Sequence, residues 1–319
     1  MAGAAHPKIQ VVLDQDYATA LEMLVANANT SIDALSFSFA IGSAAGRPSR
    51  ESSSHAIAKQ FAELKATNPS VRMRFFFEGL RETADRNRMT GEFLENAGIE
   101  VRFGSTHAKG FCFDERYVFF GSTNLTNQSL LKNREANLLI DDRDVAKGFM
   151  RYFDHQWNGG EHGGIQLPKP WLADGAFELV LIDLCDRAQR SLDFSIYFFN
   201  HRDIERAIVR AHGRGVRVRG LVHQHKSFAY PYVARSRATV ERMRRAGLHD
   251  LHFGIPTIFS HSKYIVADEK EIMLGTGNWL LEDVNTHPQL YIHIEDASVS
   301  KALLEHLASQ IQKAMGAEM

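Results

Sequence analysis

Two stretches of this chain hold the same four polar residues at the same spacing. The first stretch carries His107, Lys109, Asp114 and Asn124, and the second carries His261, Lys263, Asp268 and Asn278. Each residue of the second set follows its counterpart by 154 positions. A single strand histidine is usually a core residue, but two histidines with matched lysine, aspartate and asparagine neighbours indicate a shared chemical role.

The spacing of each histidine and its lysine predicts that the two act together. Residues two apart on a strand point to the same face of the sheet, so His107 projects with Lys109 and His261 with Lys263. The lysines, with the asparagines of the neighbouring strands, suit the nonbridging oxygens of a phosphate. One histidine can attack phosphorus, while the other protonates the leaving oxygen and then deprotonates the incoming water or alcohol. The pattern therefore predicts a phosphodiesterase with one site between two similar halves.

The similarity between the two stretches extends to other parts of the chain. Residues 31–37 resemble residues 191–197, and residues 97–100 resemble residues 246–249. The matches follow one another in the same order at nearly constant separation, which indicates a duplication of domain size.

Apolar strand-like runs alternate with helix-like runs in both halves, which predicts an α/β protein with a mixed sheet in each half. Each half is expected to begin with a helix, over residues 16–29 and 175–189. Tight turns at 114–116 and 268–270 are expected to join the His-x-Lys strand to the strand that follows. A glycine- and proline-rich stretch, 158–170, is the predicted linker between an N-terminal half, 1–157, and a C-terminal half, 171–319.

The doubled pattern of His-x-Lys, four residues, Asp, six residues and Gly-Ser-x-Asn resembles the signature of the phospholipase D superfamily. The resemblance covers both halves. It implies two fused α/β/α halves of phospholipase D type, related by a pseudo-two-fold, with a phosphohistidine intermediate and neither metal nor cofactor. It also implies a structural role at the turns for Asp114 and Asp268. Ser122, Thr276 and Gln289 are expected to support the site.

The same resemblance predicts an acidic residue that orients the histidine of its own half. Glu135 fits this position in the first half, whereas the second half offers His287 or Gln289. A carboxylate on the far ring nitrogen raises the basicity of the near one, whereas an amide only orients the ring. We therefore expect His107 to be the nucleophile and His261 to be the acid.

Composition predicts a cytoplasmic protein. The formal net charge is −1, no apolar run is long enough for a transmembrane helix, and the first ten residues lack a signal-peptide pattern. Cys112 and Cys185 are predicted to be buried free thiols. His223 and His225 lack a third ligand at useful spacing, so no metal is expected. Because one chain carries both motifs, a dimer is not required for the site.

Two substrate classes fit this chemistry. A nuclease is favoured, because the arginine-rich stretches 202–219 and 235–245 could contact nucleic acid. A phospholipase D or phosphatidyltransferase is the alternative, because the apolar run 255–259 before His261 and the aromatic run 228–232 could meet lipid. An idle nucleic-acid-binding module fits less well, since both motifs are intact. Nucleic acid is thus the predicted substrate, with phospholipid as the alternative.

Overall fold

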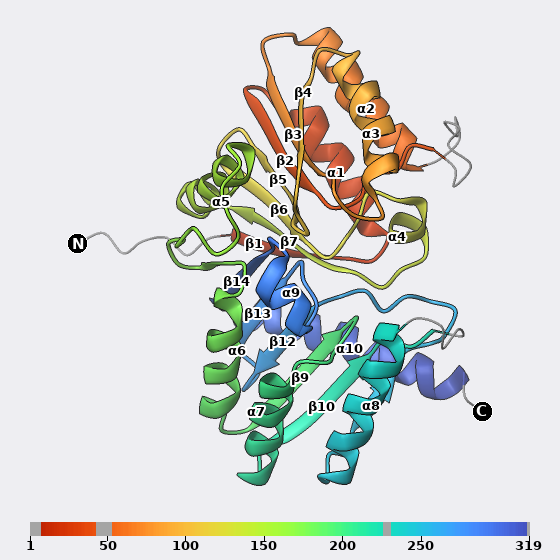
Figure 1. Ribbon diagram of the computed structural model, residues 1–319, viewed down its shortest axis with the longest axis vertical. Coiled ribbons are helices and arrows are strands. Elements are labelled where there is room, and N and C mark those ends of the chain that lie inside the picture. The colour runs from red at the N-terminus through yellow and green to blue at the C-terminus, as the bar shows by residue number, and fades with distance from the viewer. Residues whose placement is uncertain (1–7, 43–52, 226–230, 318–319) are drawn as a thin grey trace.

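The computed structural model describes residues 8–42, 53–225 and 231–317. The chain forms two lobes, with the first half above the second in Figure 1 and one seven-stranded sheet in each. The first sheet contains β1 (Lys8–Leu13), β2 (Ser31–Ser36), β3 (Arg72–Glu78), β4 (Glu100–Gly104), β5 (Lys109–Phe113), β6 (Tyr117–Gly121) and β7 (Ala136–Asp141). The second contains β8 (Trp171–Ala173), β9 (Ser191–Ile196), β10 (Arg217–Val222), β11 (Leu251–Phe253), β12 (Tyr264–Ala267), β13 (Glu271–Gly275) and β14 (Leu290–Glu295).

The two sheets have the same topology, which confirms the predicted pair of mixed-sheet halves. The first runs β1-β7-β6-β5-β2-β3-β4, and the second, counted from its corresponding edge, runs β8-β14-β13-β12-β9-β10-β11. In each sheet three neighbouring strands are parallel and the others pair antiparallel.

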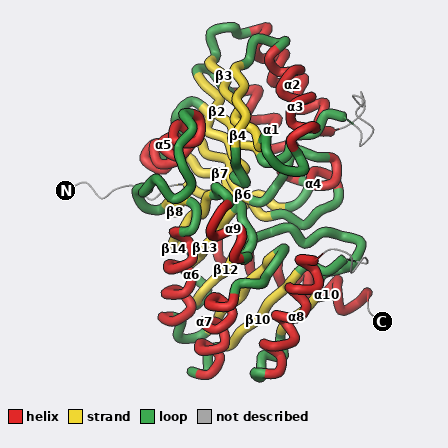
Figure 2. The backbone as a smooth tube through the Cα atoms, viewed as in Figure 1, coloured by secondary structure: helices red, strands yellow, loops and turns green. Residues whose placement is uncertain are grey.

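Helices cover both faces of each sheet (Figure 2). The first lobe has α1 (Asp16–Asn27), α2 (Ser53–Thr67), α3 (Ala84–Glu95), α4 (Asn127–Leu131) and α5 (Arg143–Trp157). The second has α6 (Ala176–Arg187), α7 (Arg202–Gly213), α8 (Pro231–Arg245), α9 (Leu281–Thr286) and α10 (Ala297–Ala317). Among the described helices, none has the length and apolar character needed to cross a bilayer.

Three large apolar cores hold these layers together. One lies between the first sheet and helices α1 and α2, around Leu21 and Phe61, and another lies between the second sheet and helices α6 to α8. The third crosses the junction of the lobes, because Tyr152 of α5, Leu274 of β13 and Leu303 of α10 belong to one buried cluster. Burial of a large apolar side chain contributes about 1.5–3 kcal/mol, so this shared core fixes the lobes against each other.

The predicted turns occur where expected, and an aspartate organises each. Asp114 and Asp268 both have positive φ. Oδ1 of Asp114 accepts hydrogen bonds from the amides of Thr30 and Ser31 at 2.7 and 3.0 Å, and Asp268 accepts matching bonds in the second lobe. Asp114 thereby ties its turn to the start of β2, and Asp268 ties its turn to the start of β9. Both turns lie at the end of the motif strand that is remote from the histidine.

One feature of the fold differs from the sequence expectation, and another agrees with it. Each lobe begins with an edge strand, β1 or β8, rather than with a helix. These strands escaped prediction because each pairs on one side only and β1 begins with exposed polar residues, Lys8 and Gln10, that alternate with partly buried ones. Cys112 and Cys185 are free and buried, as expected.

Candidate active site

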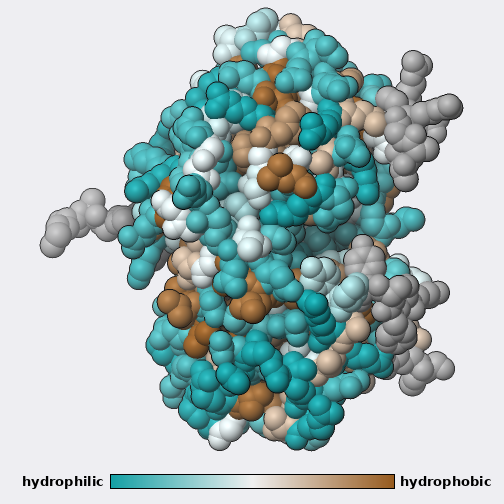
Figure 3. All heavy atoms as spheres, viewed as in Figure 1, coloured by the Kyte–Doolittle hydropathy of each residue, from teal (hydrophilic) through white to brown (hydrophobic). Residues whose placement is uncertain are grey.

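A cavity of about 600 Å³ lies between the two lobes and takes side chains from both. In the space-filling view the surface is hollowed where the lobes meet, and the side chains around the hollow are mostly hydrophilic (Figure 3). The polar residues of the cavity wall include both motif histidines and both motif asparagines: His107, Asn124, His261 and Asn278.

The two motif strands present their polar residues in the same way. Lys109 is the first residue of β5, and Lys263 directly precedes β12, so each histidine sits just before a central strand. Both lysines are buried beneath the histidines. Nζ of Lys109 donates to the carbonyl of His107 at 2.8 Å, and Nζ of Lys263 donates to the carbonyl of His261. The structure therefore gathers both predicted pairs at one place.

Glu135 contacts the histidine of the opposite lobe, so its expected pairing with His107 is wrong. Nδ1 of His261 lies 2.9 Å from Oε2 of Glu135. The same carboxylate accepts hydrogen bonds from Oγ of Ser122 at 2.5 Å and from Nδ2 of Asn133 at 3.0 Å. The cause is the chain path: the backbone of Arg134 pairs with the segment just before His261, which carries Glu135 across the junction.

The second lobe has no equivalent carboxylate on His107. Gln289 occupies the matching position, but its Nε2 donates to the carbonyl of Asp283 at 2.6 Å. Thr276 occupies the position of Ser122, and its hydroxyl group bonds to the backbone of Leu290 rather than to a carboxylate. Nδ1 of His107 is buried and has no hydrogen-bond partner among the described residues. The two histidines therefore differ in their support.

Burial and crowded positive charge shape the ionisation of the site. Burial, with the neighbouring lysines, holds the pKa of His107 well below its ordinary value. Burial lowers the pKa of His261 to about 4 despite the opposing effect of Glu135. Burial also lowers the pKa of Lys263 to about 7. Burial alone would raise the pKa of Glu135, but His261 and Lys263 outweigh it and hold that pKa below its usual value.

The cavity residues outside the predicted set include Tyr197 and Asp283. Tyr197 packs edge-on against His261, with ring centroids 4.7 Å apart. Asp283 is buried and lies 2.7 Å from His287, measured between Oδ1 and Nδ1. Asp283 stands 154 residues after Ser129 in the duplication, so the replacement of a serine by an aspartate was the signal that could have found it.

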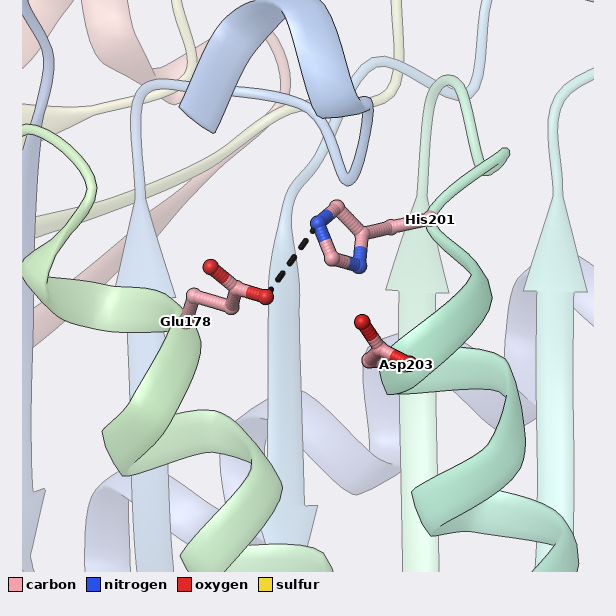
Figure 4. Close-up of side chains that lie close together, drawn as sticks. All are labelled: Glu178, His201 and Asp203. Atoms are coloured by element: carbon pink, nitrogen blue, oxygen red, sulfur yellow. Dashed lines mark ion pairs between the residues drawn. The ribbon is translucent and has the colours of Figure 1, made fainter. Parts of the chain in front are cut away.

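A cluster of two carboxylates and a histidine lies outside the cavity, in the second lobe (Figure 4). Nε2 of His201 lies 3.4 Å from Oε1 of Glu178, and Asp203 follows in the first turn of α7. Both carboxylates are in first helical turns, where they complement the positive end of the helix dipole. That position accounts for the cluster without a bound cation.

His223 and His225, the other histidines weighed as ligands, do not form a ligand set with any third residue in the described part of the chain. His223 instead stacks on Tyr197, with ring centroids 4.6 Å apart. Burial lowers its pKa to about 3.

Comparison with known proteins places this geometry in a family. A family model described as "Cardiolipin synthase, PLD-like domain" matches residues 8–157 and 181–311. The chain belongs to the phospholipase D superfamily. This confirms the resemblance that the doubled motif carried, and the general activity of the superfamily is directed at phosphodiester bonds.

Curated relatives of this chain include mitochondrial cardiolipin hydrolases from several species. The one from Xenopus tropicalis is 31% identical over 132 residues, which are 40% of this chain and 58% of that protein. The one from Homo sapiens is 26% identical over 118 residues, which are 37% of this chain and 44% of that protein. The chain thus spans about half the length of these relatives.

Solved structures with the same fold cover nearly the whole chain. Phosphatidylserine synthase from Haemophilus influenzae Rd KW20 superposes with a TM-score of 0.72 at 16% identity, over 96% of this chain and 86% of that one. Polyphosphate kinase from Porphyromonas gingivalis superposes with a TM-score of 0.68 at 12% identity, over 96% of this chain and 47% of that one. At such low identity these matches establish the fold alone.

Proposed function

We propose that this protein cleaves phospholipids at the head-group phosphodiester through a phosphohistidine intermediate. The observation that carries the proposal is the cavity that both motif histidines line, with their lysines buried beside it. Within the described residues, a carboxylate contacts His261 and none contacts His107. The proposed nucleophile is His261 and the proposed acid and base is His107, which reverses the roles expected from the sequence.

His261 has the contacts that a nucleophile needs. A carboxylate only accepts hydrogen bonds, so Glu135 keeps the proton of His261 on Nδ1. Nε2 then carries a lone pair that can attack phosphorus. With a pKa of about 4, the ring is neutral at neutral pH. The P–O bond to the head group breaks as the bond from phosphorus to Nε2 forms.

His107 stands on the other side of the reaction. It gives a proton to the leaving oxygen, and it then takes a proton from the water that attacks the phosphohistidine. Lys109 and Lys263 lie beneath the two rings and are placed to neutralise the nonbridging oxygens, as are the amides of Asn124 and Asn278. A bound phosphate also favours protonated His107, which offsets the burial that lowers its pKa.

The cavity wall supports a lipid substrate. Around His261 it is largely aromatic and apolar, with side chains suited to a diacylglycerol backbone. These residues are Tyr197, Phe198, Tyr232, Phe259 and Leu280. Phe259 ends the apolar run noted in the sequence. Tyr232 ends the aromatic run, of which residues 228–230 lie outside the described part of the chain.

The arginine-rich stretches, which favoured nucleic acid, are largely neutralised within the second lobe. Arg217 and Arg219 both pair with Asp193. Glu205 pairs with both Arg202 and Arg242. Arginines in such pairs offer less attraction to a phosphate backbone than solvated ones. Together with the cardiolipin-related family and relatives, this favours phospholipid over the nucleic-acid substrate preferred from the sequence.

The test is an assay of the purified protein in EDTA on four substrates: phosphatidylglycerol, phosphatidylcholine, single-stranded DNA and RNA. We expect release of phosphatidic acid from phospholipid, with no such release by His261→Ala. Activity in EDTA is expected because lysines and amides supply the charge that a cation would otherwise bring. Cleavage of nucleic acid with no hydrolysis of either lipid would overturn the proposed substrate.

A further inference from the structure

A third histidine lies in the cavity wall, outside both repeated motifs. His287 caps the C-terminus of α9, and its side chain is 24% exposed. Its Nδ1 lies 2.7 Å from Oδ1 of Asp283. Oδ2 of Asp283 accepts a hydrogen bond from the backbone amide of Asn278 at 3.0 Å, which fixes the carboxylate. The contact between His287 and Asp283 sets Nδ1 against the carboxylate at ion-pair distance, without the geometry of a hydrogen bond, and leaves Nε2 for a ligand.

His287 lies beside His107 without touching it. The ring centroids are 6.2 Å apart, which is too far for a direct hydrogen bond between the rings. The amide of His107 donates to the carbonyl of Pro288 at 2.6 Å, so the two segments are tied together. In the proposed reaction His107 contacts the leaving oxygen, and His287 therefore faces the alcohol attached to it.

The cavity is poorly suited to a head group that carries a quaternary ammonium. Such a cation is bound by open aromatic faces, but three aromatic rings of the wall already have a protein cation over them. Nζ of Lys109 lies 4.8 Å from the ring centroid of Phe37. Nζ of Lys263 lies 5.2 Å from the ring centroid of Tyr197. Cζ of Arg235 lies 5.5 Å from the ring centroid of Tyr232. Arg81 and Arg86 add further positive charge to the wall.

We propose that His287, which lies against Asp283, recognises the alcohol side of the phosphodiester by hydrogen bonding to a free hydroxyl of the head group. The site thereby selects polyol head groups, such as glycerol, over quaternary ammonium head groups, such as choline. This inference rests on the proposed phospholipid substrate and names the class of head group. His287 is a specificity residue that touches the leaving alcohol, whereas His107 remains the proton donor.

The experiment compares kcat/KM for phosphatidylglycerol and phosphatidylcholine in mixed micelles, for wild type and three variants. His287→Leu removes the donor. His287→Asn keeps a donor and introduces the residue found at the matching first-half position, Asn133. His252→Asn is the control, because His252 also pairs with an aspartate, Asp250, at 2.7 Å but lies outside the cavity wall.

Wild type is expected to prefer phosphatidylglycerol. His287→Leu should lower kcat/KM for that lipid by about 10- to 100-fold, as expected when a partner of a substrate hydroxyl is lost, with a far smaller loss on phosphatidylcholine. His287→Asn should recover part of the preference, and His252→Asn should keep all of it. Equal losses on both lipids, an unchanged ratio, or a wild-type preference for phosphatidylcholine would overturn the inference alone. Hydrolysis of neither lipid by wild type would overturn the proposed function with it.

Discussion

The two lobes have the same strand order, yet they place different side chains in and behind the cavity wall at the same three positions. The first lobe has Ser129, Asn133 and Glu135, and the second has Asp283, His287 and Gln289. At these positions each lobe has one buried carboxylate, Glu135 in the first and Asp283 in the second. When the two repeats are aligned, these carboxylates stand six positions apart. The first carboxylate reaches across to His261, whereas the second stays in its own lobe with His287. A duplicated scaffold can therefore hold a site whose two sides perform different steps.

The largest expected effect comes from removing each histidine in turn. His261→Ala should lower kcat by about 10⁴-fold or more on any phosphodiester, because no attacking nitrogen remains. His107→Ala should lower it by about 10²–10⁴-fold on natural substrates. With an activated leaving group, attack continues in His107→Ala while water activation fails, so a phosphohistidine should accumulate on His261.

Mass spectrometry after an alkaline quench locates the adduct. A phosphohistidine on His107 in the His261→Ala protein would reverse the two roles and restore the assignment made from the sequence. Adducts in both variants would mean that the lobes are chemically interchangeable.

Glu135→Gln makes the two lobes alike at the matching positions 135 and 289. We expect kcat to fall by about 10- to 100-fold, because the amide orients His261 without the negative charge that raises its basicity. Glu178→Gln, outside the cavity, is the matched control and should retain full activity. If Glu135→Gln reduced only thermal stability, the carboxylate would be a structural group.

The pH dependence of kcat/KM tests the ionisation of the free enzyme. His261 has to be neutral and gains a proton below its pKa of about 4, so activity should fall as the pH drops through 4. On the alkaline side two groups have to be charged: His107, whose pKa burial holds well below its ordinary value, and Lys263, which loses its proton above about 7. Activity should therefore begin to fall below neutral pH as His107 loses its proton, and should fall further as the pH rises through 7. In kcat the alkaline limb should move upward, because bound phosphate stabilises the charged lysine. A profile that stays flat to pH 9 would contradict the role of Lys263.

The smallest expected effect concerns stability. Gly277 stands where the first lobe has Thr123, and a Cβ at Gly277 would lie 1.1 Å from Oε1 of Gln289. Gln289 is fully buried, so Gly277→Thr should destabilise the protein by about 1–3 kcal/mol. Urea unfolding measures this, and Gly316→Ala, where nothing lies within 4 Å of the added Cβ, is the control. A Gly277→Thr protein as stable as wild type would show that Gln289 has room to move.

The sequence predicted the repeated fold and both histidine–lysine pairs because these depend on local spacing. A spacing of two residues keeps each lysine close to its histidine, although the structure places both histidines just before β5 and β12 rather than on these strands. The sequence did not predict which histidine Glu135 would contact, because that contact depends on how two separate sheets dock. Sequence separation between Glu135 and His261, 126 residues, gives no sign of proximity. Asp283 escaped notice because it does not belong to the repeated motif, and His287 was considered only as a possible counterpart of Glu135.

The passage of Glu135 across the lobe junction has an evolutionary consequence. In an ancestral homodimer of single halves, every substitution would have appeared on both sides of the cavity at once. In the fused chain the two halves can differ: position 289 holds an amide where position 135 holds a carboxylate, and His287 stands where the first half has Asn133. The N-terminal half lacks the third histidine, and the C-terminal half lacks the carboxylate that contacts the opposite histidine. Separation into two identical copies would leave either two unsupported nucleophiles or two sites without the third histidine, so the fusion has become irreversible.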